Sequence, residues 1–261
     1  MTKSELRLKL SPTEAVEDYL KTIYLLREEA LARGEAGRVS TNALAERLDV
    51  EPGSVTGMLK KLSGGKDAMP PLVVHEPYRG VELTPVGEKL ALEIVRHHRL
   101  LELYLTRVLG FRWDEVHEQA DEMEHVISEE FEEKIDSLLG SPIEDPHGDP
   151  IPTREGDLPE QTDLVSLAQL ELGHSGRIRR VSDQDPELLR HLAGLHLLPN
   201  AEVTVLERAP FGGPVRLRVR LSSREPAGVT SGETSNGGSL LELEQSIGPQ
   251  LAACILVKRV S

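Results

Sequence analysis

Residues 39–83 contain the pattern that most restricts what this chain can fold into. Apolar residues recur at helical spacing in VSTNALAERLDV, and a second short helix is predicted to open at Pro52, a residue suited to the first position of a helix. A tight turn over 49–51 joins the two helices. Two short β-prone runs, 72–75 and 80–83, then flank a turn that contains Pro77. This order predicts a helix-turn-helix followed by a β-hairpin wing.

The second of these helices is the one expected to contact DNA. Residues near the N-terminal end of such a helix reach base edges in the major groove, where Ser and Thr bind bases or phosphates and Gly permits close approach. Nearby lysines and arginines neutralise phosphates. The predicted contact residues are Arg47, Pro52, Ser54, Thr56, Gly57, Lys60, Lys61 and, at the tip of the wing, Arg79. The two helices alone would also suit a hairpin in a helical bundle, but the wing that follows favours DNA binding.

Longer helices are predicted on both sides of this pattern. Apolar residues follow helical spacing from Thr13 to about Arg33, with Ser11-Pro12-Thr13 as a start signal. Asp18 lies near the edge of the apolar stripe of this helix. A long helix is expected to begin at Thr84-Pro85 and to run into the region of His98.

The segment from His98 to His125 suggests metal binding. In its second half, His117 is followed by Asp121, Glu124 and His125 at offsets of four, seven and eight residues. This spacing would place all four side chains on one face of a single helix. Gly110 separates the two halves, and Asp114 is the expected N-cap of the second helix. Imidazole with carboxylate suits Mn, Fe, Co, Ni or Zn. The candidate ligands are His98, Glu102, His117, Asp121, Glu124 and His125. The alternative is a solvated helix face, since the segment is rich in glutamate.

Composition narrows the class of protein. The chain has 261 residues, enough for two or three domains, and no apolar run reaches the ~18 residues that a membrane span needs. The N-terminal residues lack the apolar core of a secretory signal, and the single cysteine, Cys254, cannot form an internal disulfide. We therefore expect a cytoplasmic protein without membrane contact.

The charge is unevenly distributed along the chain. The net charge of −14 argues against a general polyanion binder. Residues 1–70 carry 11 basic and 11 acidic side chains, whereas residues 71–140 carry 7 basic and 16 acidic ones. A DNA-binding surface is therefore expected in the neutral first segment, and the acidic middle segment suits cations.

These motifs together resemble the diphtheria toxin repressor family of metal-dependent transcription regulators, including its manganese-sensing branch. The resemblance covers about 150 residues, with the motifs in family order. It is carried by EDYLKTIYLL (17–26), VEPGSVTGMLKKL (50–62), YRGVELTPVGEKLA (78–91), HRLLELYL (98–105), VHEQADEMEHVIS (116–128) and PHGDPIP (146–152).

The resemblance implies two metal sites. The primary site would take Asp18, Asp121, Glu124 and His125, and the second His98, Glu102 and His117, with His97 as a neighbour. Iron-sensing members place sulfur ligands at the positions of Asp18 and Asp121, so the oxygen and nitrogen ligands here point to Mn(II), with Fe(II) second and other divalent transition metals binding in vitro. Lys21 occupies a position where manganese sensors carry a carboxylate. A charged lysine cannot ligate a metal, which favours two separated sites over a closely spaced two-manganese centre.

The C-terminal part resembles the SH3-like domain of longer family members, which is similar to the ferrous-transport accessory protein FeoA. Short strands with glycine turns, one helix at about 186–197 and a final strand at 251–260 suggest a small, partly closed barrel. Residues 222–239 have almost no apolar side chains and are expected to form a mobile loop. In the family this domain can lend ligands to the second metal site, and the nearest candidates are Asp183 and Gln184.

The expected architecture is α+β, with four segments. These are a winged helix-turn-helix domain (1–83), a helical dimerisation and metal-binding domain (84–152), a linker (153–164) and an SH3-like domain (165–261). The expected function is that of a homodimeric regulator, not an enzyme, which binds a palindromic operator in double-stranded DNA when Mn(II) or Fe(II) is present. The alternatives are an iron-dependent regulator, a dinuclear metallohydrolase and a regulator that senses a small organic ligand. No nucleophile elbow, phosphate loop or HExxH motif is present to support the hydrolase.

Overall fold

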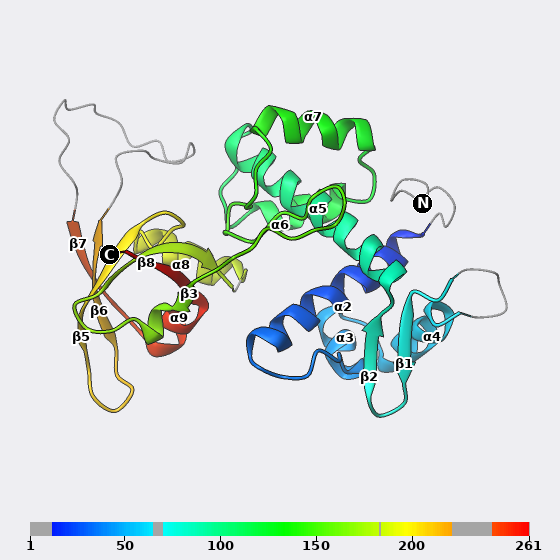
Figure 1. Ribbon diagram of the computed structural model, residues 1–261, viewed down its shortest axis with the longest axis horizontal. Coiled ribbons are helices and arrows are strands. Elements are labelled where there is room, and N and C mark those ends of the chain that lie inside the picture. The colour runs from blue at the N-terminus through cyan, green and yellow to red at the C-terminus, as the bar shows by residue number, and fades with distance from the viewer. Residues whose placement is uncertain (1–11, 65–69, 183, 221–241, 261) are drawn as a thin grey trace. The chain divides into compact units, whose positions relative to one another are not determined.

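The computed structural model describes residues 12–64, 70–182, 184–220 and 242–260, which Figure 1 draws in colour. Its contacts divide the chain into two units. The first contains the chain up to His97 together with residues 124–131 and 152–157, and the second contains residues 98–123, 132–151 and the chain from Leu158 onward. The domain boundaries expected from the sequence stay a prediction. Among the described helices, none is both long and apolar enough to cross a membrane.

Three of the helices described in the first unit lie in the predicted places. They are α2 (Glu14–Ala32), α3 (Thr41–Arg47) and α4 (Pro52–Leu62). The hydroxyl of Ser40 accepts a hydrogen bond from the backbone N–H of Ala43 at 3.1 Å, which caps α3. Asp49 adopts a positive φ of 51° in the turn between α3 and α4. Local capping and turn residues therefore form the helix-turn-helix, as predicted.

The wing is a two-stranded antiparallel hairpin of β1 (Val73–Glu76) and β2 (Gly80–Leu83). A bridge between Val39 and Val81 connects it to the segment before α3. Gly80 has a φ of +94°, and a Cβ at this position would lie 2.6 Å from the carbonyl oxygen of Val39. Only glycine therefore allows this close approach of hairpin and chain.

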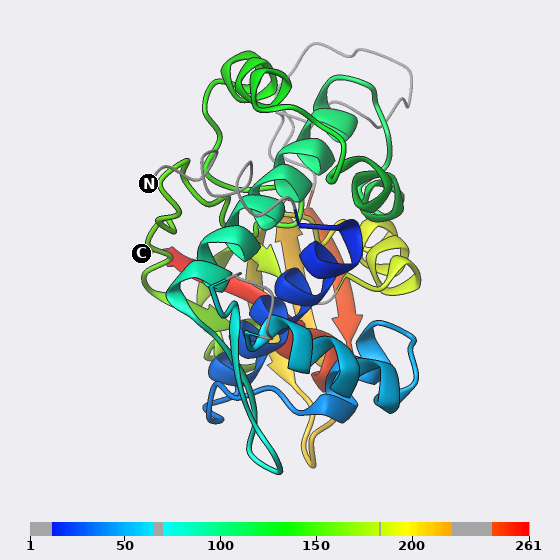
Figure 2. The same cartoon turned by 90° about the vertical axis from the view of Figure 1, so that its right-hand side faces the viewer.

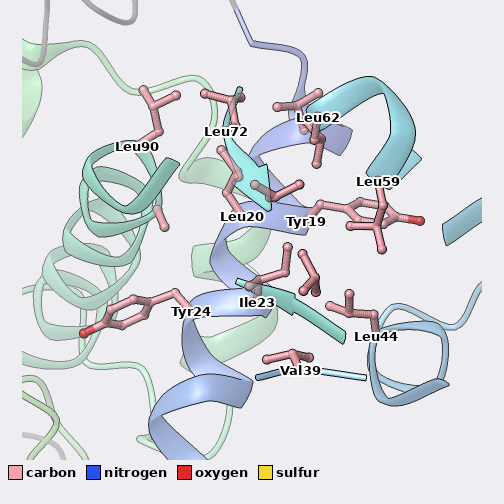
Figure 3. Packing of buried hydrophobic residues seen from close by; sticks show 14 of the residues in the cluster. Tyr19, Leu20, Ile23, Tyr24, Val39, Leu44, Leu59, Leu62, Leu72 and Leu90 are labelled. Atoms are coloured by element: carbon pink, nitrogen blue, oxygen red, sulfur yellow. The ribbon is translucent and has the colours of Figure 1, made fainter. Parts of the chain in front are cut away.

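One apolar core holds the helices and the hairpin together. It takes side chains from α2, α3, α4, both strands and the first half of α5 (Pro85–Arg107). Figure 3 shows Leu20 and Ile23 of α2 among Leu44, Leu59 and Leu72. The first four of these are fully buried and Leu72 is almost so, and each buried side chain of this size stabilises the fold by about 1.5–3 kcal/mol. Helix α4 is thus fixed by its buried face and keeps its other face exposed.

The segment after α5 departs from the prediction of one helix reaching His125. Helix α6 (Val116–Met123) ends before Glu124, and a further helix, α7 (Glu129–Leu139), begins after a turn. The hydroxyl of Ser128 accepts a hydrogen bond from the N–H of Phe131 at 3.2 Å, and this cap starts α7. The predicted single face for the four candidate ligands is therefore wrong.

Asp114 does not cap α6 as expected. Its carboxylate accepts hydrogen bonds from Arg112 at 3.0 Å and from Arg190 at 3.5 Å. The aspartate is buried and is held by these two guanidinium groups, one of them from the C-terminal part of the second unit.

The C-terminal part of the second unit is a six-stranded antiparallel sheet (Figure 1; Figure 2), which confirms the α+β class with a small β domain. The strand order is β3-β8-β4-β5-β6-β7. The elements are β3 (Leu164–Ser166), η1 (Leu167–Gln169), β4 (Ser175–Val181), α8 (Pro186–Gly194), β5 (Glu202–Arg208), β6 (Val215–Arg220), β7 (Glu242–Ile247), α9 (Pro249–Cys254) and β8 (Ile255–Val260).

The final strand is shorter than predicted, because residues Pro249–Cys254 form α9 before β8 begins. Pro249 at the first turn and the burial of Ala252 in the core favour this helix. The expected mobile loop at 222–239 lies outside the described residues.

Candidate metal centres and DNA-contact surface

The first cluster of candidate ligands consists of Asp18, Glu124 and His125. One ligand atom from each lies within 4.8 Å of the others. Nε2 of His125 lies 3.0 Å from Oδ1 of Asp18 and 3.5 Å from Oε1 of Glu124. Asp18 comes from α2, whereas the other two come from the turn after α6, so the cluster joins segments far apart in the sequence.

Two further side chains hold this cluster in place. Oε2 of the buried Glu17 lies 2.7 Å from Nδ1 of His125, which leaves Nε2 of that ring directed at Asp18. Metal-binding histidines are usually oriented by a carboxylate that contacts the ring nitrogen not bound to the metal. His97 is fully buried, and its Nδ1 lies 3.1 Å from the backbone oxygen of Glu124. His97 therefore lies next to the first cluster, and Glu17 is a residue that the sequence analysis missed.

The electrostatics of the first cluster are those of a partly buried group of carboxylates. Burial raises the pKa of Asp18, although His125 acts in the opposite direction, and the negative charge of Glu124 raises it further. Oxygen and imidazole nitrogen donors of this kind fit a divalent transition metal. A bound divalent cation would offset the repulsion between the two carboxylates.

Lys21 supplies a positive charge to the same cluster. Its Nζ donates hydrogen bonds to both carboxylate oxygens of Glu124, at 2.9 and 2.7 Å. Both side chains are buried, with exposed fractions of 10% for Lys21 and 1% for Glu124. The lysine noted in the sequence therefore forms an ion pair with a candidate metal ligand.

The second cluster brings together His98, Glu102 and His117, the residues expected to form the second metal site. Oε1 of Glu102 lies 2.9 Å from Nε2 of His98 and 3.2 Å from Nδ1 of His117. The two ring nitrogens are 3.0 Å apart. Two imidazole nitrogens and a carboxylate oxygen converge at this point, which is a donor set that suits a divalent transition metal.

Asp121, predicted as a ligand of the primary site, contacts the second cluster. Its Oδ1 lies 3.2 Å from Nδ1 of His98, and its Oδ2 lies 3.6 Å from Nε2 of His117. His117 and Asp121 lie on α6, which ends at Met123, whereas Glu124 and His125 lie in the turn that follows it.

A third group, which the sequence analysis did not single out, consists of Glu102, Asp145 and His147. All three are buried, and within the described part of the chain no hydrogen-bond partner is found for Glu102 Oε2, Asp145 Oδ2 or His147 Nδ1. Nδ1 of His147 lies 3.7 Å from Glu102 Oε2. Although burial lowers the pKa of His147, the charge of Glu102 raises it to about 9, and burial raises that of Asp145 to about 7. The signal in the sequence was the D-x-H spacing in 145–147.

The loop that carries Asp145 and His147 is fixed against β4. Gly148 has a φ of +88°, and a Cβ there would lie 1.8 Å from the carbonyl oxygen of Arg179. The amide of Gln184 donates to Oδ2 of Asp149 at 2.9 Å, and Arg180 lies 2.6 Å from Oδ1 of the same residue. Gln184, a candidate ligand of the second metal site, therefore contacts Asp149. Asp183, the other candidate, lies outside the described residues.

The predicted DNA-contact residues lie on exposed parts of the first unit. Pro52, Ser54, Gly57, Lys60 and Lys61 are exposed on α4, and Thr56 is partly exposed, with its hydroxyl bonded to the carbonyl of Pro52 at 3.1 Å. Arg79, at the wing tip, is exposed and lies 3.3 Å from Glu76. Arg47 pairs with Glu29 at 2.8 Å. Exposed pairs of this kind are weak, so both arginines could exchange their partners for phosphates.

A winged helix-turn-helix combined with imidazole–carboxylate clusters defines a class of DNA-binding regulators that respond to divalent metals. Comparison with known proteins supports the assignment of this chain to that class. Three family models match the chain. They are "Iron dependent repressor, N-terminal DNA binding domain" over residues 12–81, "Iron dependent repressor, metal binding and dimerisation domain" over 84–153 and "FeoA domain" over 165–225. The chain belongs to the iron-dependent repressor family, which includes the diphtheria toxin repressor.

Its relatives include both iron and manganese regulators. The chain is 35% identical to the iron-dependent repressor IdeR of Mycobacterium tuberculosis over 77% of this chain and 86% of IdeR. It is 37% identical to the transcriptional regulator MntR of Geobacillus thermodenitrificans over 49% of this chain and 82% of MntR. A solved structure of a manganese-dependent transcriptional repressor in complex with manganese matches with a TM-score of 0.74 and 33% identity, over 94% of this chain and 100% of that one.

Proposed function

We propose that this family member is activated for operator binding by Mn(II), with Fe(II) as the alternative effector. The single observation that carries the proposal is the cluster of Asp18, Glu124 and His125, because it supplies only oxygen and imidazole nitrogen donors. Hard carboxylate oxygens suit Mn(II) better than they suit a metal that prefers sulfur. Asp121 remains the fourth ligand predicted from the sequence, and His98, Glu102 and His117 form the proposed second site.

The proposed switch acts through the position of α2. Asp18 lies on α2, which packs in the core that also holds α4, while Glu124 and His125 lie in the turn after α6. A divalent cation bound to Asp18, Glu124 and His125 would neutralise the charges of the two carboxylates. It would also join the two segments that carry these residues. Ligands that bind one arrangement more tightly shift the population toward it. The favoured arrangement would be the one that fits DNA.

We further propose that the active species is a homodimer on a palindromic DNA site. A family model for a metal-binding and dimerisation domain covers residues 84–153. In a two-fold dimer, two copies of α4 would have to meet major grooves separated by about one helical turn of DNA or a multiple of it. A small change in the orientation of α4 would then change the affinity strongly.

The test is a titration of DNA binding by the full-length protein with Mn(II), Fe(II) and Zn(II) at fixed salt, with iron kept anaerobic. Stronger maximal binding with Mn(II) than with the other two ions supports the proposal, and a larger response to Fe(II) would support the iron-dependent alternative. DNA binding that does not respond to any divalent metal would exclude the proposed switch and favour a regulator that senses an organic ligand.

A further inference from the structure

The ammonium of Lys21 supplies a positive charge to the cluster of Asp18, Glu124 and His125 when no metal is bound. It contacts both carboxylate oxygens of Glu124, at 2.9 and 2.7 Å, in a buried environment. Attraction between opposite charges is much stronger at a buried site than in water. Glu124 therefore has a strong partner before any metal arrives.

This ion pair joins the same two segments as the proposed metal. Lys21 follows Asp18 by three residues on α2, so both side chains lie on neighbouring positions of one helix face. Glu124 belongs to the turn after α6, 103 residues away from Lys21 in the sequence. Oε1 of Glu124 accepts from Nζ of Lys21 at 2.9 Å and is also the oxygen that lies 3.5 Å from Nε2 of His125, so a metal bound there would share this oxygen with the ammonium.

We propose that Lys21 is an internal competitor of the effector metal at the cluster of Asp18, Glu124 and His125, an inference that rests on the proposed function. Its ammonium holds Glu124 in the metal-free protein and repels a divalent cation bound to the same carboxylate. Lys21 thereby raises the metal concentration at which the protein responds. It also places a full positive charge against the buried carboxylate of Glu124 when no metal is present.

Lys21 could compete with the metal, or it could only support the fold. These two roles predict different effects of its replacement on metal binding. If Lys21 only supports the fold, replacing it lowers the stability of the protein and leaves metal binding unchanged or weaker. If it competes with the metal, replacing it lowers the stability of the metal-free protein and tightens metal binding. The combination of a lower melting temperature without metal and a lower Kd for metal is therefore specific to competition.

The experiment compares wild type with Lys21→Met and Lys21→Gln as full-length proteins. The Kd for Mn(II) is measured by competition with a chelating dye at fixed pH and salt, and Tm is measured without metal. Both neutral variants should bind Mn(II) about tenfold more tightly or better, because the repulsion is lost. The glutamine retains an N–H donor for Glu124, which keeps a folded variant available should the methionine variant fail to fold.

Two control variants separate local charge from other effects. Lys21→Arg keeps a permanent charge and should keep Kd within about threefold of wild type. Lys258→Met removes the same charge from an exposed position on β8 and should leave Kd unchanged.

A Kd in the folded neutral variants that equals or exceeds that of wild type overturns the inference. Failure of the proposed function gives a different result. In that case wild type binds Mn(II) without a gain in DNA affinity, while the comparison of Kd values still decides the role of Lys21.

Discussion

At the scale of the residue, the first cluster is built from pairs of side chains. Glu17 and Asp18 are neighbours on α2, yet one contacts Nδ1 of His125 and the other Nε2. Because the two ring nitrogens point in opposite directions, Glu17 holds one side of the ring while Asp18 faces the nitrogen that is proposed to bind metal. Glu124 lies near the same nitrogen and is itself held by Lys21.

The role of the ligands predicts the effect of removing them. Glu124→Ala or His125→Ala should abolish metal-stimulated DNA binding while leaving the proposed dimer intact, because the cluster loses one of its three donors. The measurement is DNA affinity with and without Mn(II), together with the molecular mass in solution. Glu122→Ala, which removes an exposed carboxylate of α6, is the matched control and should respond as wild type. Unchanged metal stimulation in both ligand variants would refute the assignment of this site.

Removal of the Glu17 carboxylate should also weaken metal binding, but less than removal of a ligand does. Glu17→Gln should weaken Mn(II) binding by about 10- to 100-fold, since loss of the carboxylate behind a ligating histidine makes the ring a poorer and less well oriented donor. Glu14→Gln, one turn earlier and exposed on α2, should leave the affinity unchanged. Equal Kd values for the Glu17 and Glu14 variants would show that Glu17 does not act on the metal through His125.

At the scale of the element, α4 combines a buried face with an exposed one. Val55, Leu59 and Leu62 are buried in the core, which fixes the helix to α2 and the hairpin. Thr56 and Lys60 lie on the part that remains accessible. The side chains proposed for DNA contact are therefore presented by an element that packing holds rigidly.

Two substitutions on α4 should have different effects on DNA binding. Lys60→Ala should weaken binding to all sequences alike and lower the slope of log affinity against log salt by about 1, because one phosphate contact is lost. Thr56→Ala should mainly reduce the preference for the operator over random DNA. Lys258→Ala, on the exposed part of β8, is the control for loss of charge. Wild-type salt dependence and selectivity in both α4 variants would mean that α4 is not the recognition helix.

At the scale of the whole molecule, metal and DNA are proposed to act on one equilibrium. Thermodynamic linkage then requires that each ligand raise the affinity for the other by the same factor. We expect operator DNA to lower the Kd for Mn(II) by the same factor by which saturating Mn(II) lowers the Kd for the operator. The two factors are measured in one buffer, with a chelating dye for the metal and a labelled duplex for DNA. A metal affinity that operator DNA leaves unchanged would rule out this coupling, and random duplex serves as the control.

Local sequence signals determined the helices and the wing. Helices α2, α3 and α4 and strand β2 lie where apolar spacing, the cap at Ser40 and the turns predicted them. These signals act between residues within one or two turns of chain, so they can be read without knowing the fold. Membership of the second cluster was also predictable in this way for His98 and Glu102, which are one helical turn apart on α5.

Only the tertiary structure decided how the charged groups are paired. Helix α6 ends at Met123, before Glu124 and His125, and the packing of α2 brings Glu17 and Lys21 to His125 and Glu124 across more than 100 residues of sequence. Packing also brings the loop that carries His147 to Glu102 on α5. A buried charge must find a partner because leaving it unpaired is costly, but which partner it meets depends on how distant elements pack. No periodicity within one segment contains that information.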